Sequence, residues 1–538
     1  RDGWIAFGRG ADGGRISGPY LVKDVDLPRT DFRIRADGSA IEPITGGTHT
    51  FGFTYSSAGH RFVVSTTAPA IQVAPIDYRY LIRNPMAASS GLTHDITPDR
   101  RAYPRSEAHP WRKKRAEHAD YFEYYRSRYG ASDSDPSGWF TSGCSPFVYR
   151  DTVISALQGQ LLACDPAQNF IFRGELNRSD DPKEIVYQLA RHTNEQTKEF
   201  CASSDAWSHP MSLSHGPDGA VWIVDYYREI IEDYSGIPRH LQQQYGLYRG
   251  HDRGRIYRLT HEDANPLPNP DMTGKSTREL VDELTSPSSW RRETALRLLR
   301  ESKSLAPKDA APSLLQAELR HEQGTLENTS VLRMLDDSDP ITRMHAARYA
   351  EPDLRKDDTA LLDKVVELVS TEEDPWVLLQ LALSLGESKS HRAGQSLLSL
   401  ARKHGDIRWM TTAIHSSLYL REQIVMDGLK EDVGKGADLL GAIEQSGEKL
   451  AVSGAKTIVE TASQPLDDAT FGEFVKGLEQ PRDPAHGAEV FQQHCAICHQ
   501  IGGIGVNVGP DILGEIGVGE EALLRQILVP AERIRPGC

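Results

Sequence analysis

The spacing of hydrophobic residues changes along the chain. Up to about residue 262, short runs of Val, Ile, Tyr, Phe and Trp alternate with turns rich in Gly, Asp and Pro, and helical periodicity is confined to about 107–130. Alternation with a period of two residues between such turns is typical of β-strands. The pattern therefore predicts an all-β region over residues 1–262.

One turn-and-strand unit recurs in this region. A short glycine-containing turn precedes an alternating strand at residues 2–7, 58–64 and 217–225. Recurring hairpins of this kind favour the blades of a β-propeller, and at roughly 45 residues per blade the region supplies five or six of them. Fewer are supplied if an insertion at 100–140 is discounted. Because the sequence opens inside a strand, we expect a fragment with an N-terminally incomplete propeller.

Residues 270–472 have a helical spacing of hydrophobic residues. They are rich in Leu, Ala, Glu, Lys and Arg, and their apolar residues are three and four positions apart, as in amphipathic helices. A weak repeat aligns on Trp290, Ile341, Trp376 and Ile407, at intervals of 51, 35 and 31 residues. These intervals are loosely those of a two-helix unit. We predict a HEAT-like α-solenoid that acts as a spacer, with a partner-binding concave face as the alternative.

Two Asp-Pro pairs mark expected helix starts in this region. Asp339 precedes Pro340, and Asp374 precedes Pro375. An aspartate caps the free N–H groups of a helix, and proline fits the first helical position because that N–H needs no partner. We therefore expect helices to begin at both prolines.

A third pattern lies near the C-terminus, where the chain reads Cys495-Ala-Ile-Cys498-His499. The spacing C-x-x-C-H is the signature of c-type haem attachment, with thioethers to both cysteines and the imidazole on the iron. A zinc site would need a second pair of ligands nearby, and a thioredoxin-type dithiol would need βαβ surroundings. We predict covalent haem c on Cys495 and Cys498, with His499 as the proximal iron ligand.

The surroundings of this motif resemble class I cytochromes c. Gly487 and Phe491 stand at the small and aromatic positions of that family's first helix, and the segment around Pro510 is similar to its Gly-Pro-x-Leu segment. The resemblance implies an α-helical cytochrome domain over 480–538, C-terminally incomplete, in which the Pro510 carbonyl accepts a hydrogen bond from His499 Nδ1. None of the seven Met residues follows His499, so the sequence does not identify the sixth iron ligand. Three alternatives are expected: the ligand lies in a missing C-terminal part, it is a histidine, or the sixth position of the iron is vacant.

Short segments along the whole chain follow, in order, the pattern of one larger family. They are residues 2–5, 31–35, 51–53, 79–85, 216–219 and 252–257. The chain resembles planctomycete and verrucomicrobial membrane-bound dehydrogenases, in which a propeller similar to sugar dehydrogenases precedes HEAT repeats and a Pirellula/Verrucomicrobium-type haem-binding domain. The resemblance implies a multidomain protein with boundaries near 1–262, 270–472 and 480–538.

That resemblance also implies a chemistry. The propeller is expected to oxidise a small-molecule or carbohydrate substrate of the sugar or alcohol type, with pyrroloquinoline quinone and Ca²⁺ as candidate cofactors. Haem c would pass the electrons to an acceptor cytochrome or oxidase outside the cytoplasm, in the periplasm or at the periplasmic side of a membrane. The alternative is a glycan- or protein-binding scaffold that carries a haem for electron transfer or sensing.

Catalytic residues in the propeller are left unassigned. The best local group is residues 204–210 together with His215 and Asp225. Asp225 could orient a histidine base or bind Ca²⁺. The alternative is that Asp205 and Asp225 cap turns and that Trp207 fills an interface between blades.

Cys144 and Cys164 flank what look like neighbouring strands. They either pair in an oxidising compartment or remain buried thiols.

Charge and hydropathy narrow the range of partners. The 61 basic and 76 acidic residues give a formal net charge of −15, whereas nucleic-acid binding needs a surplus of Lys and Arg. We expect no nucleic-acid partner. The basic run 111–115 is interleaved with acidic residues, which favours a solvated insertion or a dock for an acidic redox partner. No apolar run approaches the roughly 18 residues of a membrane helix, so no membrane association is visible in the sequence.

Overall fold

The structure is a computed structural model, and its described parts fall in two compact units. The sheet unit comprises Arg1–Asp77, Ser90–Ala350 and Asp374–Val377, and the helical unit comprises Tyr78–Ser89, Glu351–Glu373 and Leu378–Cys538. Within these units the structure describes residues 4–8, 13–47, 50–84, 87, 91–110, 112–113, 117, 137–231, 249–268, 271–302, 312–356, 359–419, 421–452, 468–478, 483–495, 500–501, 504–505 and 519–528.

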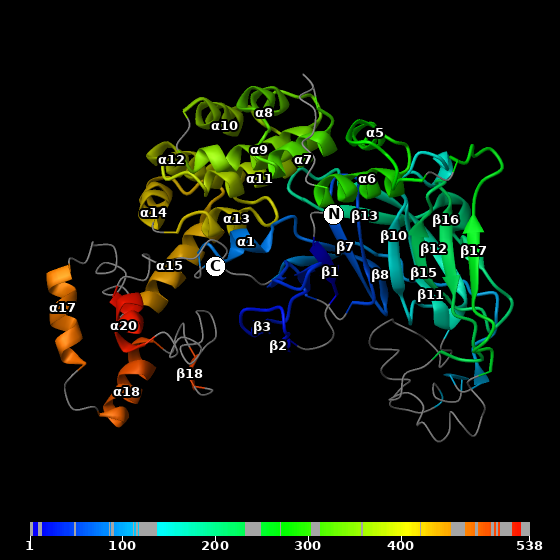
Figure 1. Ribbon diagram of the computed structural model, residues 1–538, viewed down its shortest axis with the longest axis horizontal. Coiled ribbons are helices and arrows are strands. Elements are labelled where there is room, and N and C mark those ends of the chain that lie inside the picture. The colour runs from blue at the N-terminus through cyan, green and yellow to red at the C-terminus, as the bar shows by residue number, and fades with distance from the viewer. Residues whose placement is uncertain are drawn as a thin grey trace. The chain divides into compact units, whose positions relative to one another are not determined.

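The sheet unit opens with small antiparallel sheets and continues with larger ones (Figure 1). The small sheets pair β1 (Trp4–Phe7), β4 (Phe32–Arg35) and β5 (Ile41–Pro43), and separately β2 (Gly14–Ile16) and β3 (Val25–Leu27). The next sheet runs β6 (Phe53–Tyr55), β7 (Arg61–Ser65), β8 (Ala68–Val73), β9 (Thr93–Asp95). A further sheet runs β10 (Cys144–Val148), β11 (Leu161–Asp165), β12 (Phe170–Arg178), β13 (Tyr187–Arg191), with β14 (Cys201–Ala202) also on β12. The last runs β15 (Pro210–His215), β16 (Val221–Asp225), β17 (Arg255–Leu259).

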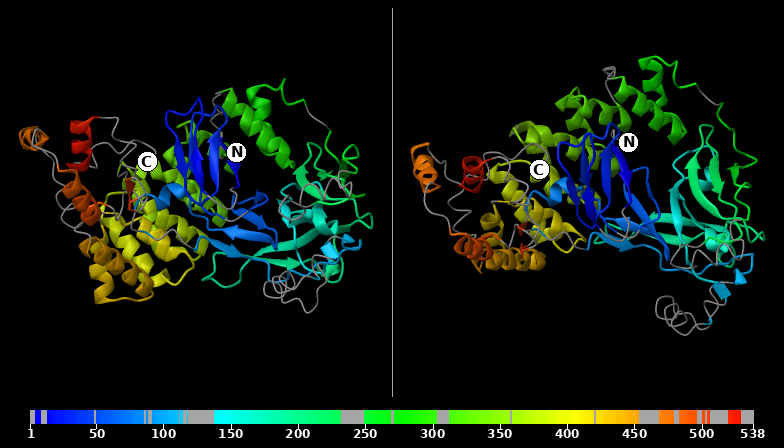
Figure 2. Two further views of the ribbon diagram at one scale, coloured as in Figure 1. Left: turned by 90° about the horizontal axis from the view of Figure 1, so that it is seen from below. Right: turned by 60° about the horizontal axis from the view of Figure 1, so that its bottom comes forward.

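Successive large sheets meet through their first strands. β6 contacts β10, and β10 contacts β15, while β11 contacts both β8 and β15. Figure 2 follows these strands from blue through cyan to green. The described strands do not close into a ring. The prediction of a sheet-rich N-terminal region is confirmed.

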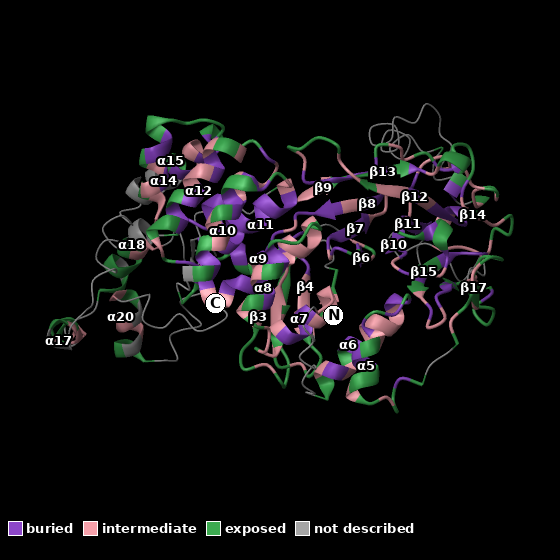
Figure 3. Ribbon diagram, turned by 90° about the horizontal axis from the view of Figure 1, so that it is seen from above, coloured by how far each residue is buried: buried purple, intermediate pink, exposed green. Residues whose placement is uncertain are grey.

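Burial follows from this stacking of sheets. β7, β8 and β11 are buried along most of their length (Figure 3), since β10 packs on β7 and β8, while β8 and β15 pack on β11. By contrast, β13 and β16 alternate buried and exposed residues, as strands with one covered face do. Short 3-10 turns complete the region at Ser155–Leu157, Pro166–Gln168 and Thr193–Glu195.

Helices follow the sheets, as the hydrophobic spacing predicted. They are α5 (Thr277–Glu283), α6 (Ser289–Glu301), α7 (Leu314–Glu322), α8 (Asn328–Leu335), α9 (Pro340–Leu354), α10 (Thr359–Thr371), α11 (Pro375–Leu385), α12 (His391–His404), α13 (Met410–Ser416), α14 (Glu422–Glu431) and α15 (Ala437–Val452). In the helical unit, α12 packs on α10, α13 and α14, and α15 packs on α13 and α14. A short helix from earlier in the chain, α1 (Tyr78–Leu81), packs on α13.

The two Asp-Pro pairs begin helices as expected. Oδ1 of Asp374 accepts the N–H groups of Trp376 and Val377 at 2.9 and 3.2 Å. Asp339 likewise accepts the N–H groups two and three positions later, at 3.2 and 3.1 Å. The prediction of N-caps at both positions is confirmed.

The C-terminal part consists of short elements. They are α17 (Asp468–Gly477), α18 (Pro484–His494), the paired strands β18 (Gln500–Ile501) and β19 (Ile504–Gly505), and α20 (Glu520–Leu528). The Arg525 guanidinium of α20 lies 4.9 Å from the centre of the Phe471 ring of α17. Among the described helices, none is long and apolar enough to cross a membrane.

Candidate functional site

The predicted haem segment is described at one of its four named residues. Cys498, His499 and Pro510 lie outside the described residues, and Cys495 is half-buried. The Cys495 N–H donates to the Phe491 carbonyl at 2.8 Å, so the α-helical hydrogen bonding of α18 continues into the first cysteine of the motif. Haem attachment remains a prediction. The helix that leads into Cys495 is compatible with it.

Gly487 of α18 has open space beside it, because a Cβ added to it would have no described atom within 4 Å. The last described helix, α20, packs on α17. Among the described residues, no three His, Cys, Asp or Glu side chains form a group that could hold a metal ion.

The Asp225 carboxylate is buried at the end of β16 and is surrounded by donors. Its Oδ1 accepts the N–H groups of His209 and Tyr227 at 2.7 and 3.1 Å. Its Oδ2 accepts the Ser208 hydroxyl at 3.1 Å and the Arg255 guanidinium at 2.8 Å. Both carboxylate oxygens are therefore engaged in fixing the turn before β15 and the start of β17.

Asp205 shapes the preceding turn. Its Oδ1 accepts the Trp207 N–H at 3.0 Å, and the half-buried Trp207 ring lies 5.9 Å from the Tyr227 ring, centre to centre. With Asp225, this confirms that the aspartates of residues 204–225 cap turns.

The His209 ring is held by backbone on both sides. Its Nδ1 lies 2.6 Å from the Pro166 carbonyl oxygen and its Nε2 lies 2.9 Å from the Arg228 carbonyl oxygen. Burial lowers the pKa of His209, although the two carbonyls act in the opposite direction. This imidazole is fixed in place by the fold, which suits a positioning role rather than proton exchange with a substrate.

His215 does not join this group. It stands at the far end of β15, where its Nδ1 lies 3.3 Å from the Asp151 carboxylate and its ring lies 4.4 Å from that of Phe147. Asp151 also accepts the N–H of Ser289, the first residue of α6, at 2.6 Å. The Asp151 carboxylate therefore ties the sheet to the start of a helix within the same unit.

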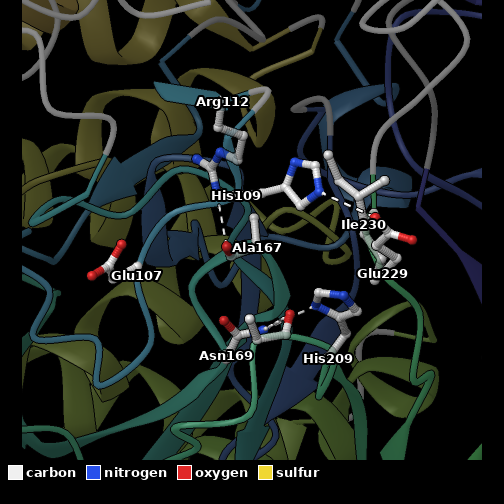
Figure 4. A pocket seen from close by; sticks show the side chains of 10 residues that line it. Glu107, His109, Arg112, Ala167, Asn169, His209, Glu229 and Ile230 are labelled. Atoms are coloured by element: carbon white, nitrogen blue, oxygen red, sulfur yellow. Dashed lines mark hydrogen bonds and ion pairs between the residues drawn. The ribbon is translucent and has the colours of Figure 1, made fainter. Parts of the chain in front are cut away.

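A narrow cleft with room for about one water molecule lies beside His209 (Figure 4). Its lining brings together residues from distant parts of the sheet unit, namely Glu107, His109, Arg112, Ala167, Asn169, Ala206, His209, Glu229, Ile230 and Ile231. His109 Nε2 lies 4.0 Å from Glu229 Oε1. Burial holds the pKa of His109 below its ordinary value, with Glu229 acting the other way, so this imidazole is largely neutral near pH 7.

The basic run at 111–115 is not simply a solvated surface. Arg112 is buried, and its guanidinium donates to the Ala167 carbonyl at 2.9 Å and the Thr141 hydroxyl at 2.7 Å. Lys113 pairs with Glu107 at 2.8 Å. The expectation of a solvated insertion is wrong for Arg112, because its side chain anchors the segment to the sheet; residues 111, 114 and 115 lie outside the described residues.

The segment 79–85, which carried part of the family resemblance, docks on the helices of its own unit. Tyr80 is fully buried, and its hydroxyl donates to Glu351 Oε1. The Arg79 guanidinium donates to Glu351 Oε2 at 2.7 Å, and the Ser384 hydroxyl donates to Oε1 at 2.9 Å. Gln380 Nε2 donates to the Tyr80 oxygen at 3.1 Å. A buried carboxylate thus receives donors from two segments about 300 positions apart in the sequence.

The second half of this segment reaches α13. The Arg83 guanidinium donates to Glu387 Oε1 at 3.0 Å and to the Ser417 hydroxyl at 2.8 Å. Asn84 Nδ2 donates to the His415 carbonyl at 2.8 Å. Sequence reasoning missed this docking, and the one available signal was a pair of arginines four positions apart around a tyrosine.

Two family models match separate parts of the chain. Residues 1–263 match a domain of unknown function (DUF7133), and residues 328–414 match HEAT repeats. The helical region therefore contains HEAT repeats. No curated protein and no solved structure matches the chain.

Proposed function

We propose that the chain is an extracytoplasmic electron-transfer protein that carries haem c on Cys495 and Cys498, with His499 on the iron. The observation that carries the proposal is the C-x-x-C-H motif, whose first cysteine continues the hydrogen bonding of α18. Bound haem would supply a one-electron redox centre. Cys495 is half-buried and follows Phe491 by four positions, so the two residues share one face of the helix.

The same proposal assigns the sheet unit a dehydrogenase role. We infer that its sheets, which meet through their first strands, are an arc of propeller blades, as the resemblance to membrane-bound dehydrogenases suggests. Oxidation of an alcohol requires a group that accepts the hydroxyl proton. Neutral His109, which lies beside Glu229, would accept this proton. A quinone cofactor would take the hydride from the C–H bond, and its electrons would pass one at a time to the haem. An acceptor cytochrome or oxidase would receive them.

Haem attachment is tested with protein produced in a host that has a cytochrome c maturation system. We expect a pyridine haemochrome spectrum of haem c and colour that stays with the denatured protein. Cys495→Ala and Cys498→Ala each remove a thioether and lower covalent haem, whereas Cys201→Ala retains it. Colourless wild-type protein from a host that matures a control cytochrome would refute the proposal.

The dehydrogenase role is tested on the haem-loaded protein. A panel of sugars and alcohols is added with and without pyrroloquinoline quinone and Ca²⁺, and haem reduction is followed by absorbance. His109→Gln is expected to slow substrate-dependent reduction by roughly 10²-fold, the size of a general-base contribution. His261→Gln, at an exposed histidine in the same unit, is the control. If no substrate reduces the haem, the dehydrogenase role is refuted and only the role of electron carrier is left.

Binding is the second candidate function of the sheet unit. Trp222 and Ile256 are exposed on β16 and β17, at 38% and 67% of their full surface, which is typical of a face that meets a ligand or partner. A glycan or protein ligand would change tryptophan fluorescence, and Trp222→Ala would abolish that change.

A further inference from the structure

Two cysteines of the sheet unit stand directly opposite each other. Cys144 of β10 and Cys164 of β11 are partners in the antiparallel register of these strands. Directly opposed residues on antiparallel strands have Cα atoms about 4.5–5.5 Å apart, which lies within the span of a disulfide. Their side chains also point to the same face of the sheet, because opposed residues share a face.

The surroundings of the pair hold it in place. Both residues are buried, at 8% and 0% exposure, in a core that includes Leu213 and Ile171. Ser145, next to Cys144, has a φ of 47°, and its hydroxyl accepts the Leu213 N–H at 2.9 Å. A non-glycine residue in this left-handed conformation is kept there by its contacts. The bulge after Cys144 is therefore specified by the fold rather than free to slip.

We propose that Cys144 and Cys164 form a disulfide across β10 and β11. The pair loses two protons and two electrons to a disulfide donor of the oxidising compartment. One cysteine attacks the donor as its thiolate and forms a mixed disulfide, and the other then displaces the donor sulfur, which leaves as a thiol. The proposal shares with the proposed function only its extracytoplasmic location.

The register selects this pairing over the alternatives with Cys201. Cys201 of β14 pairs with Ile171 of β12, which in turn pairs with Cys164. The three cysteines thus lie in one row across the sheet, with Ile171 between Cys164 and Cys201. Two strand spacings of about 4.8 Å separate those two residues, which exceeds the reach of a disulfide.

Burial determines when the bond forms and how it resists reduction. Burial, and next the neighbouring Cys144 thiol, hold the pKa of Cys164 well above its ordinary value, so little thiolate exists in the folded protein. Exchange needs a thiolate and access to it. We therefore expect the bond to form while the chain folds and, once made, to resist reductants until the protein is unfolded.

The experiment maps the cysteines of protein directed to an oxidising compartment. Thiols are alkylated in denaturant, and the protein is cleaved with trypsin, which places Cys144, Cys164 and Cys201 in separate peptides, 129–150, 151–173 and 199–228. We expect a linked pair of the first two peptides that separates on reduction, and a singly alkylated third. Native protein treated with dithiothreitol keeps the link, and protein in guanidinium loses it. Cys201→Ala keeps it as well.

A melting-temperature measurement gives a second test of the disulfide. Reduction under unfolding conditions and refolding should lower the melting temperature of the wild type by several degrees, on the order of 5 °C, because the bond closes a loop of the unfolded chain. The double variant Cys144→Ala, Cys164→Ala should show no such shift. Singly alkylated Cys144 and Cys164, or a link to Cys201, would overturn the proposal. If the protein carries haem but Cys144 and Cys164 are not linked, only the disulfide proposal is refuted. If the two cysteines are linked but no haem is attached, only the proposed haem c attachment is refuted.

Discussion

At the scale of single residues, burial sets the charge states of the histidines. His60 is 4% exposed, its ring stacks on Trp376 at 4.2 Å between centres, and its Nδ1 lies 3.0 Å from the Tyr187 hydroxyl oxygen. Burial, together with the charge of Arg178, places the pKa of His60 well below its ordinary value of 6.5. The folded protein therefore holds this side chain neutral.

A pH-dependent stability follows. Below pH 6.5 the unfolded chain binds a proton at His60 that the folded chain does not, so the stabilisation present above pH 6.5 is lost as the pH falls. The slope for one such group is about 1.4 kcal/mol per pH unit. Urea unfolding between pH 7.5 and 5 should show wild type losing more stability than His60→Asn. His261→Gln should keep the wild-type slope, and an unchanged slope in His60→Asn would contradict the interpretation.

Asp225 gives a second test at this scale. Asp225→Asn replaces one of two accepting oxygens by a donor that faces other donors, and we expect a loss of about 2–3 kcal/mol in the free energy of unfolding. Asp205→Asn, at a partly exposed turn, should lose less than about 1 kcal/mol. Denaturant unfolding measures both. If Asp225→Asn instead stopped substrate oxidation at unchanged stability, the carboxylate would be catalytic.

At the scale of elements, local sequence explains the starts of helices but not the docking of α1. Asp339 and Asp374 act on N–H groups two and three positions away, so the Asp-Pro pairs alone were sufficient to predict them. The partners of Tyr80 lie in α9 and α11, about 270 to 300 positions later. The spacing of hydrophobic residues is a local property and cannot predict a contact over that distance. The cleft beside His209 was missed for the same reason.

The docking of α1 depends on a buried carboxylate. Glu351 is 2% exposed and receives donors from Arg79, Tyr80 and Ser384. Glu351→Ala leaves these donors without their acceptor, and we expect a loss of about 3–5 kcal/mol. Asp353→Asn, which removes a surface pair with Lys356, should change stability by less than about 0.5 kcal/mol. Equal effects of the two variants in urea unfolding would contradict the docking.

At the scale of the whole molecule, the sequence pattern predicts the order of sheet and helix correctly, because period-two and helical spacings are local properties. It does not predict that the helical unit is discontinuous in sequence, with residues 78–89 contributed from within the sheet region. The haem segment remains a prediction, since it rests on the motif itself and on the helix that precedes it.

Because the helical unit is discontinuous in sequence, we predict that a truncated protein without α1 is less helical. A polypeptide of residues 271–452 lacks α1, so Glu351 and Ser417 lose the partners they have in Tyr80 and Arg83. We expect reduced helical content by circular dichroism, and recovery when a peptide of residues 76–86 is added. A scrambled peptide of the same composition is the control. Full helicity without the peptide would show that α1 is dispensable.

The docking of α1 also constrains how such a protein arises and diverges. A repeat array joined end to end to a sheet domain near residue 270 would lack residues 78–89, which belong to the helical unit. Related chains should change Arg79, Tyr80 and Glu351 in concert, and inheritance of the two regions should be coupled in spite of their different architectures.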